Sequence, residues 1–158
     1  PKPINARCES IQTKPSFRDA YRARRCLIPI DLFFEWMKIL EPDGKPVKGA
    51  KQPYAIAMKD RRPFAVAGVW ESWVDKASGE ITRSFAIVTC QANALMATIH
   101  DRMPVILAPE NYQRWLDAIE PDPFELMVPF PPELMEIWPI SSRVNSPGNN
   151  REDVAAPV

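Results

Sequence analysis

Short apolar blocks recur along the chain and are separated by proline, glycine or charged residues. Blocks of about four to eight residues that are rich in aromatic and β-branched side chains are typical of strands. We interpret six blocks as strands: Leu32–Met37, Tyr54–Met58, Phe64–Trp70, Ser84–Cys90, Val105–Leu107 and Met135–Ile140. The turn sequence Lys76–Gly79 returns the chain into the fourth of these strands.

Two further segments have the pattern of short helices. Asn93 favours the cap of a helix through Ile99, because the residues after it are good helix formers. This helix must end near Met103, because Pro104 disfavours helical geometry in the residue before it. A second helix is expected over Pro109–Ile119, with proline in its first turn.

Proline is unusually frequent, whereas the rest of the composition is ordinary. The chain has 158 residues, of which 18 are proline and 5 are glycine. Prolines at about twice the usual share shorten strands and break helices, so we expect a loop-rich α+β fold. Hydrophobic residues make up 46% and charged residues 25%, the balance of one globular domain. No apolar run approaches the roughly 20 residues that cross a bilayer, so no membrane partner is expected.

Three cysteines and one histidine limit the chemistry that the chain can carry. Cys8, Cys26 and Cys90 form no C-x-x-C pair, and one histidine leaves too few ligands for a structural zinc site. We therefore expect no metal, no other cofactor and no disulfide framework, in a reducing cytoplasm. Cys26 lies in an apolar run typical of a core. The other two have no neighbour that would activate the thiol, and we interpret them as structural.

The formal net charge is zero, but the charges are unevenly distributed. Residues 1–30 carry seven basic and two acidic side chains, a net charge of +5, whereas residues 101–158 carry four basic and ten acidic ones, a net charge of −6. Such polarity can build a basic face for a polyanion. The alternative is a solvated surface that only balances the acidic end.

Glu35 and His100 are the residues best suited to proton transfer. Glu35 has apolar neighbours, a setting in which a carboxyl group keeps its proton more readily. His100 is the only imidazole and falls near the end of the first predicted helix. The alternatives are an exposed glutamate on an edge strand and a histidine that makes surface hydrogen bonds.

Six ordered motifs resemble those of one family. The motifs are Asn5-Ala6-Arg7, Lys14-Pro15-Ser16-Phe17-Arg18, Arg25-Cys26-Leu27-Ile28-Pro29, Phe34-Glu35-Trp36, Ala92-Asn93 and His100-Asp101-Arg102-Met103-Pro104-Val105. In this order the chain resembles the SRAP family, the SOS-response-associated peptidases, and Arg143-Val144-Asn145 fits its C-terminal pattern. The resemblance covers most of the chain. It implies one domain with a mainly antiparallel, barrel-like β core and short peripheral helices.

The resemblance implies a sensor of abasic sites in single-stranded DNA. In the family, an N-terminal cysteine condenses through its thiol and α-amine with the ring-opened sugar aldehyde and closes a thiazolidine, which shields the lesion as a DNA–protein crosslink. By motif, Glu35 matches the glutamate that senses the site, His100 the histidine that stabilises it, and Asn5 the asparagine beside the crosslink. The residues expected to contact DNA are Arg7, Arg18, Arg102 and Trp36.

The start of the chain departs from the family's pattern. The family opens with Met-Cys-Gly-Arg, and tens of residues precede its Asn-Ala-Arg run, whereas this chain opens at Pro1. We therefore expect an SRAP domain at residues 1–146 without its N-terminal cysteine segment, followed by a tail at residues 147–158.

Three functional classes follow from these observations. The first is the family enzyme, which forms the crosslink through a cysteine outside this sequence. The second is an inactive remnant that binds single-stranded DNA, and the third is a cysteine hydrolase or peptidase that uses Cys90 with His100.

The expected partner is single-stranded DNA with abasic sites, in an SOS response to DNA damage. We expect a cytoplasmic, nucleoid-associated location, and the oligomeric state is left open.

Overall fold

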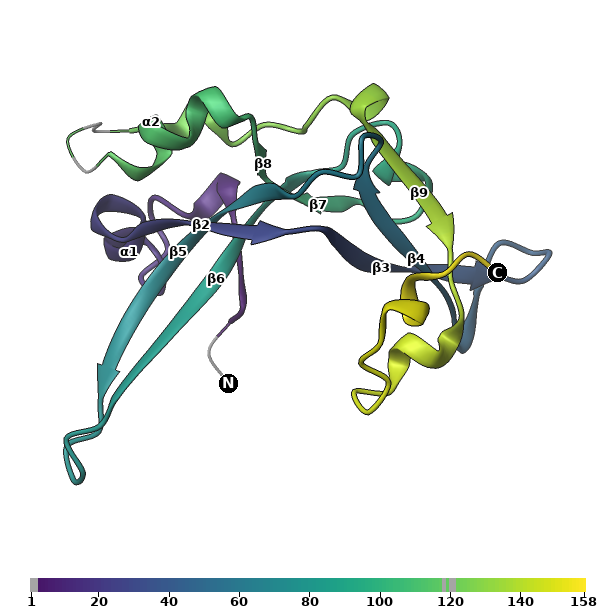
Figure 1. Cartoon of the computed structure of the whole chain (residues 1–158), viewed down its shortest axis with the longest axis horizontal. Coiled ribbons are helices and arrows are strands. Elements are labelled where there is room, and N and C mark those ends of the chain that lie inside the picture. Colours follow the sequence, from purple (N-terminus) through teal and green to yellow (C-terminus); the bar gives the residue numbers. More distant parts are fainter. Residues whose placement is uncertain (1–2, 118, 120–121) are drawn as a thin grey trace. The chain divides into compact units, whose positions relative to one another are not determined.

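The chain is built from two compact units, each with its own β-sheet (Figure 1). The computed structural model describes residues 3–117, 119 and 122–158. Unit 1 comprises residues 1–30, 64–91 and 102–130, and unit 2 comprises residues 31–63, 92–101 and 131–158. Each unit combines segments that are distant in the sequence.

Unit 1 contains sheet A, which is built around a long antiparallel hairpin of β5 (Phe64–Val74) and β6 (Ile81–Gln91). Three further strands pair antiparallel with this hairpin: β2 (Arg25–Ile30) and β8 (Ile106–Leu107) with β5, and β7 (Arg102–Pro104) with β6. β1 (Asn5–Arg7) pairs parallel with β6. The helical elements are η1 (Cys8–Ser10), α1 (Arg18–Ala23), η3 (Pro109–Asn111), α2 (Tyr112–Leu116) and η4 (Phe124–Leu126).

Strand β6 shows why one face of sheet A belongs to the core. It is buried at Ala86, Val88 and Cys90 and half-buried or exposed at the residues between them. This alternation in the burial of successive side chains is typical of a strand with one covered face. Helices α1 and α2 contact β5 and β2, and their Tyr21 and Trp115 rings lie 6.1 Å apart between centroids.

The far half of the β5–β6 hairpin has no flanking strand among the described residues (Figure 1). β2 pairs with β5 only as far as Val69, and β1 pairs with β6 only from Ile87 onward. Large apolar side chains remain exposed on this arm, namely Trp73, Val74, Ile81 and Phe85.

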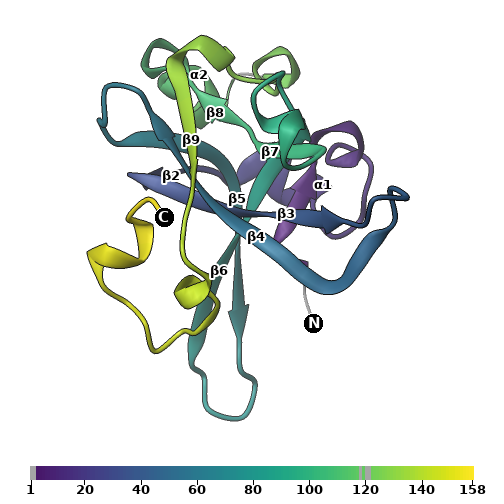
Figure 2. The same ribbon diagram turned by 90° about the vertical axis from the view of Figure 1, so that its right-hand side faces the viewer.

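Unit 2 contains sheet B, an antiparallel sheet in the order β3-β4-β9 (Figure 2). Its strands are β3 (Leu32–Leu40), β4 (Pro46–Met58) and β9 (Met135–Pro139). Its helical turns are η2 (Met96–Thr98), η5 (Pro132–Leu134), η6 (Ser142–Asn145) and η7 (Glu152–Ala155). The central strand carries most of the sheet's buried residues, from Ala55 to Met58.

The side chain of Gln52 supplies, in sheet B, the hydrogen-bond donor that Pro53 lacks. Proline in a central strand removes a donor, and here the missing N–H faces Ile140, whose own N–H donates to Pro53 O at 3.0 Å. Gln52 Nε2 donates to Ile140 O at 2.9 Å and to Pro53 O at 2.9 Å. The Gln52 amide therefore replaces the donor that Pro53 lacks.

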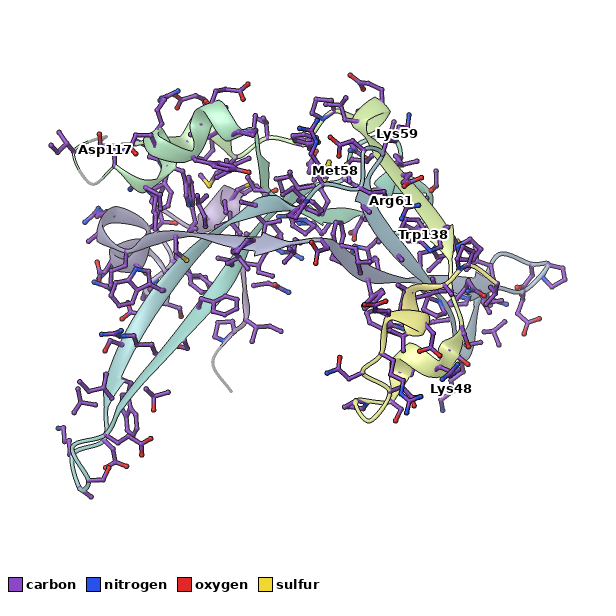
Figure 3. The ribbon with its side chains drawn as sticks, viewed as in Figure 1. Lys48, Met58, Lys59, Arg61, Asp117 and Trp138 are labelled. Carbon is purple, nitrogen blue, oxygen red and sulfur yellow. The ribbon has the colours of Figure 1, made fainter. Side chains whose placement is uncertain are left out.

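The turn after β4 is fixed to sheet B through Arg61. This residue has φ 59°, a left-handed conformation that few residues other than glycine adopt. Its guanidinium carbon lies 4.3 Å from the centroid of the Trp138 ring, and its Nε is 2.6 Å from Glu136 Oε1 (Figure 3). Both partners belong to β9, so the strained turn is held by two contacts to one strand.

The segment expected to be a separate tail packs back onto unit 2. Trp138 Nε1 donates to Ala155 O at 2.7 Å, and the N–H of Val158 donates to Pro139 O at 3.2 Å. Arg143 Nη1 lies 3.1 Å from Asp153 Oδ2. Residues 147–158 are therefore part of this compact unit.

The α+β class is confirmed, with mostly antiparallel strands and a few short helices. All six predicted strands are present, although those in the two hairpins extend further than the apolar blocks. Among the strands and α-helices, those without a predicted counterpart are β1, α1, β2 and β7. Cys26, which we expected in the core, is half-buried, whereas Cys8 and Cys90 are buried.

The predicted helix over Asn93–Ile99 is wrong in type. Only the turn η2 forms, although Asn93 does act as a cap, since its Oδ1 accepts the N–H of Met96 at 2.9 Å. The second predicted helix ends at Leu116, and residue 118 within its range lies outside the described residues.

Candidate functional site

His100 stands at the end of a closed loop in unit 2, formed by residues 92–101. The loop is closed by the N–H of Ala92, which donates to Asp101 O at 3.1 Å. The N–H of His100 donates to Met96 O at 2.8 Å, and Met96 is fully buried. Asn93 Nδ2 also donates to a buried sulfur, Met135 Sδ, at 3.3 Å. These contacts fix the backbone from which the imidazole projects.

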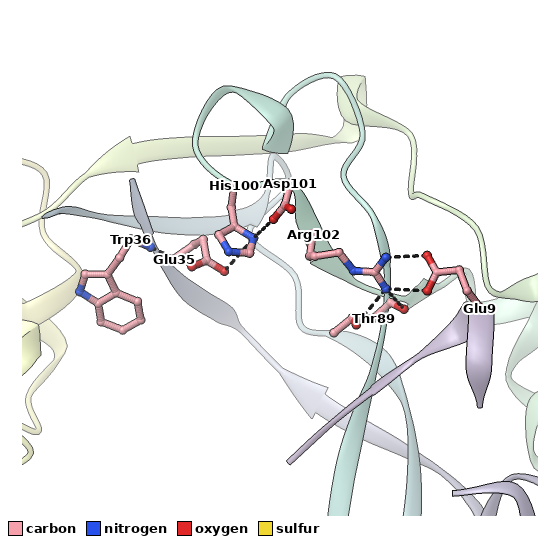
Figure 4. Close-up of polar contacts among 7 residues, drawn as sticks. All are labelled: Glu9, Glu35, Trp36, Thr89, His100, Asp101 and Arg102. Atoms are coloured by element: carbon pink, nitrogen blue, oxygen red, sulfur yellow. Dashed lines mark hydrogen bonds and ion pairs between the residues drawn. The ribbon is translucent and has the colours of Figure 1, made fainter. Parts of the chain in front are cut away.

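Glu35 meets His100 within unit 2. Glu35 lies on β3, an edge strand of sheet B, and its Oε2 is 3.8 Å from His100 Nδ1 (Figure 4). The N–H of Trp36 donates to Glu35 Oε1 at 3.0 Å and orients the carboxylate. Asp101 Oδ1 lies 3.4 Å from the same Nδ1. The side chains of Glu35 and His100 are 26% and 38% exposed, so a ligand can reach both.

This arrangement places two carboxylates beside one imidazole nitrogen. At 3.8 Å the Glu35–His100 contact is an ion-pair contact rather than a hydrogen bond, and both groups are of the types that exchange protons with a bound ligand. Together with the exposure of both groups, the geometry is suited to acid–base chemistry. Sequence analysis identified Glu35 and His100 but assigned no role to Asp101, which lies inside the same motif.

Trp36 projects away from this pair. Successive side chains of a strand point to opposite faces, and Figure 4 shows the Trp36 indole directed away from the Glu35 carboxylate. Trp36 Nε1 donates to Asn145 Oδ1 at 2.8 Å. The expected DNA-contact residue is therefore joined by its polar edge to η6 of the same unit.

The other expected site residues belong to unit 1, where several share one face of sheet A. Asn5 and Arg7 are exposed on β1, with the buried Ala6 between them. Arg7 pairs with Thr89 of β6. Arg102 of β7 reaches the same threonine, since its Nη2 donates to Thr89 O at 2.8 Å and to Thr89 Oγ1 at 3.2 Å. Thr89 is thus the register partner of Arg7 and the hydrogen-bond acceptor of Arg102.

Arg102 forms an ion pair that sequence analysis missed. Its Nη1 and Nη2 donate to Glu9 Oε1 at 2.5 Å and to Glu9 Oε2 at 3.0 Å (Figure 4). These hydrogen bonds lower the pKa of Glu9 from 4.5 to about 2, so the carboxylate is charged at neutral pH. The only available signal was an acidic residue beside a basic motif, because the partners are far apart in the sequence.

The remaining arginines of residues 1–30 differ in their surroundings. Arg18 is exposed at the start of α1, with its Nε 3.7 Å from Asp19 Oδ1. Arg24 pairs with Glu71, and Arg25 is buried.

The internal cysteines are unsuited to act as nucleophiles. Cys8 and Cys90 are buried, and burial raises the pKa of both thiols, that of Cys90 to about 12. Burial also raises the pKa of Cys26. Among the described residues, no three His, Cys, Asp or Glu side chains are grouped as a metal site requires.

A family model described as SOS response associated peptidase (SRAP) matches residues 1–147. The chain belongs to this family.

Two curated relatives carry the description abasic site processing protein. YoqW of Bacillus subtilis (strain 168) is 42% identical over 156 residues, covering 97% of this chain and 66% of that protein. HMCES of Xenopus tropicalis is 28% identical, covering 99% of this chain and 50% of that protein. The chain thus spans about half to two thirds of the length of these relatives.

A solved structure agrees with the SRAP fold described above. The crystal structure of a protein from Bacteroides thetaiotaomicron has a TM-score of 0.83 and 31% sequence identity, and the match covers 98% of this chain and 65% of that one. Within the described part of the chain, no helix has the length and apolar character needed to cross a bilayer.

Proposed function

We propose that this SRAP chain supplies the acid–base groups and the strand-binding face for processing abasic sites in single-stranded DNA. The observation that carries the proposal is the contact between Glu35 and His100 in unit 2. The names of the relatives support abasic-site processing in DNA damage as the setting. A cytoplasmic, nucleoid-associated location in the SOS response is the corresponding proposal for its place in the cell.

In the proposed reaction, an N-terminal cysteine of the longer protein condenses with the sugar aldehyde. The α-amine adds to the carbonyl and water leaves as the imine forms; the thiol then adds to the imine carbon, and a thiazolidine closes. Opening the sugar ring and expelling water both need proton transfer. Glu35 and His100 are the proposed proton carriers, with Asn5 beside the crosslink.

Strand binding is proposed for unit 1 and for Trp36 of unit 2. Arg7 and Arg102 lie on either side of Thr89, and planar guanidinium groups bind phosphate oxygens in pairs. Arg18 is an exposed cation at the start of α1. Trp36 is proposed to contribute through the exposed part of its ring, because stacking on bases does not need the indole N–H.

Mass spectrometry after incubation with abasic single-stranded DNA tests the proposal. We expect no covalent adduct from the 158-residue chain, because burial suppresses all three thiols. A longer form that exposes an N-terminal cysteine should form an adduct, and Glu35→Gln or His100→Asn should slow its formation at least tenfold. Glu133→Gln, at an exposed position of η5, serves as the control.

Two outcomes would contradict the proposal. Adduct formation at the wild-type rate in both Glu35→Gln and His100→Asn would remove the acid–base role. A heat-stable adduct of the 158-residue chain would show that an internal cysteine reacts. If the longer form binds abasic DNA without forming an adduct, the chain is a binding module. The burial of the internal thiols favours this alternative over a reaction at an internal cysteine.

A further inference from the structure

Arg102 holds Glu9 in the way that arginine holds a bidentate anion. Two nearly parallel N–H···O bonds, of 2.5 and 3.0 Å, join the guanidinium to the two carboxylate oxygens. Arginine binds phosphate oxygens through the same pair of donors. The carboxylate of Glu9 therefore occupies the edge of Arg102 that a DNA phosphate would use.

The two members of this ion pair differ in exposure. The Arg102 side chain is 16% exposed, whereas the Glu9 side chain is 48% exposed. Behind Arg102, the oxygens of Thr89 accept hydrogen bonds from Nη2 and hold the guanidinium against sheet A. A ligand that approaches from the solvent thus meets Glu9 before it can reach Arg102.

We propose that Glu9 is a competing anion that occupies the phosphate position of Arg102 and must be displaced when a single strand binds. This inference rests on the proposed function, because it takes the phosphodiester of single-stranded DNA as the ligand. The internal anion weakens the phosphate contact of Arg102 and so lowers the affinity for a single strand.

The salt dependence of binding distinguishes a Glu9 that phosphate displaces from a Glu9 that only positions Arg102. A phosphate that binds arginine releases about 0.7 cations from a single strand. If Glu9 is displaced by that phosphate, an existing ion pair is broken as the new one forms. Salt screens the broken pair as well, and this partly offsets the salt dependence of the phosphate contact. Removing the charge of Glu9 should therefore make binding both tighter and more dependent on salt.

The experiment measures the binding of a fluorescent oligothymidylate by anisotropy over a range of salt concentrations. We expect Glu9→Gln to bind several-fold more tightly than wild type at low salt. Its plot of log affinity against log salt should be steeper than that of wild type, because the phosphate contact no longer replaces an ion pair. Glu71→Gln is the matched control, because it removes a carboxylate from another arginine pair of unit 1, that with Arg24.

Two further variants make the result specific. When Arg102→Ala is combined with Glu9→Gln, it should abolish the increase in DNA affinity that Glu9→Gln gives alone, because that increase depends on the Arg102 guanidinium. Glu9→Asp keeps the charge but is one methylene shorter, so its affinity should fall between those of wild type and Glu9→Gln. Thermal unfolding of each variant confirms that it is folded.

The outcomes separate this inference from the function on which it rests. Weaker binding by Glu9→Gln would show that Glu9 positions Arg102, and unchanged binding would show that it does not compete; either result overturns the inference. If wild-type binding does not depend on salt and Arg102→Ala does not alter it, the strand-binding part of the proposed function fails instead.

Discussion

Arg25 is buried, and its guanidinium joins the C-terminal ends of two helices. Nη1 donates to Tyr21 O of α1 at 2.8 Å, and Nε donates to Trp115 O of α2 at 2.6 Å. Nη2 donates to Asp117 O, just after α2. The last carbonyls of a helix have no partner within the helix, so a cation there is stabilising. One of the seven basic side chains of residues 1–30 therefore serves the fold rather than a polyanion.

At the residue scale, Glu9 predicts an acid-dependent change in stability. Hydrogen bonds from Arg102 lower the pKa of Glu9 from 4.5 to about 2 in the folded state. Because the folded pKa lies below the unfolded one, the contribution is complete above about pH 4.5 and is lost as the pH falls towards 2. We expect the melting temperatures of wild type and Glu9→Gln to converge over this window, measured by circular dichroism.

The control for this prediction is Glu133→Gln, which changes an exposed carboxylate in η5. Its melting temperature should follow that of wild type at every pH. A difference between wild type and Glu9→Gln that stays constant from pH 5 to 2 would contradict the assigned linkage.

At the element scale, sheet B should depend on the side chain of Gln52. In Gln52→Ala, the carbonyl of Ile140 loses the donor that compensates for Pro53. An acceptor left without a partner costs about 1–3 kcal/mol, and partial access of water places this case near the lower end. We expect urea unfolding to show a loss of about 1 kcal/mol. Gln113→Ala, at an exposed position of α2, should change stability by less than about 0.5 kcal/mol.

The arm of the β5–β6 hairpin predicts self-association. Phe85 is 57% exposed on a stretch of β6 without a flanking strand among the described residues, and exposed apolar strand edges favour association. Phe85→Lys should shift sedimentation velocity profiles towards the monomer at high concentration. Thr82→Lys adds the same charge to an exposed position of the same strand; an equal effect of both variants would show that charge alone is responsible.

At the scale of the whole molecule, deleting residues 147–158 should destabilise the protein. The deletion removes Ala155 O, the acceptor of the Trp138 indole, and Asp153, the partner of Arg143. We expect the melting temperature to fall on the order of 5 °C, measured by calorimetry. Trp138→Phe in the full chain removes only the indole hydrogen bond and should give a smaller decrease. An unchanged melting temperature after the deletion would show that the segment is a tail without a structural role.

The sequence by itself determined the elements whose signal is local. Short apolar blocks rich in aromatic and β-branched side chains located six of the strands, because such a block is a property of each strand alone. The suitability of Glu35 and His100 for proton transfer was also visible, since it depends on residue type. Local signals failed at residues 93–99, where closure of a loop replaces a helix.

Only the tertiary structure decided which charges are exposed and which are paired. Arg25 and Arg102 have the same chemistry in the sequence, yet one holds two helices and the other holds Glu9. Trp36 is adjacent to Glu35 but is joined to Asn145 through its indole N–H. These partners come from segments brought together by strand pairing and core packing. Such contacts depend on the sum of many distant interactions, so no local pattern contains them.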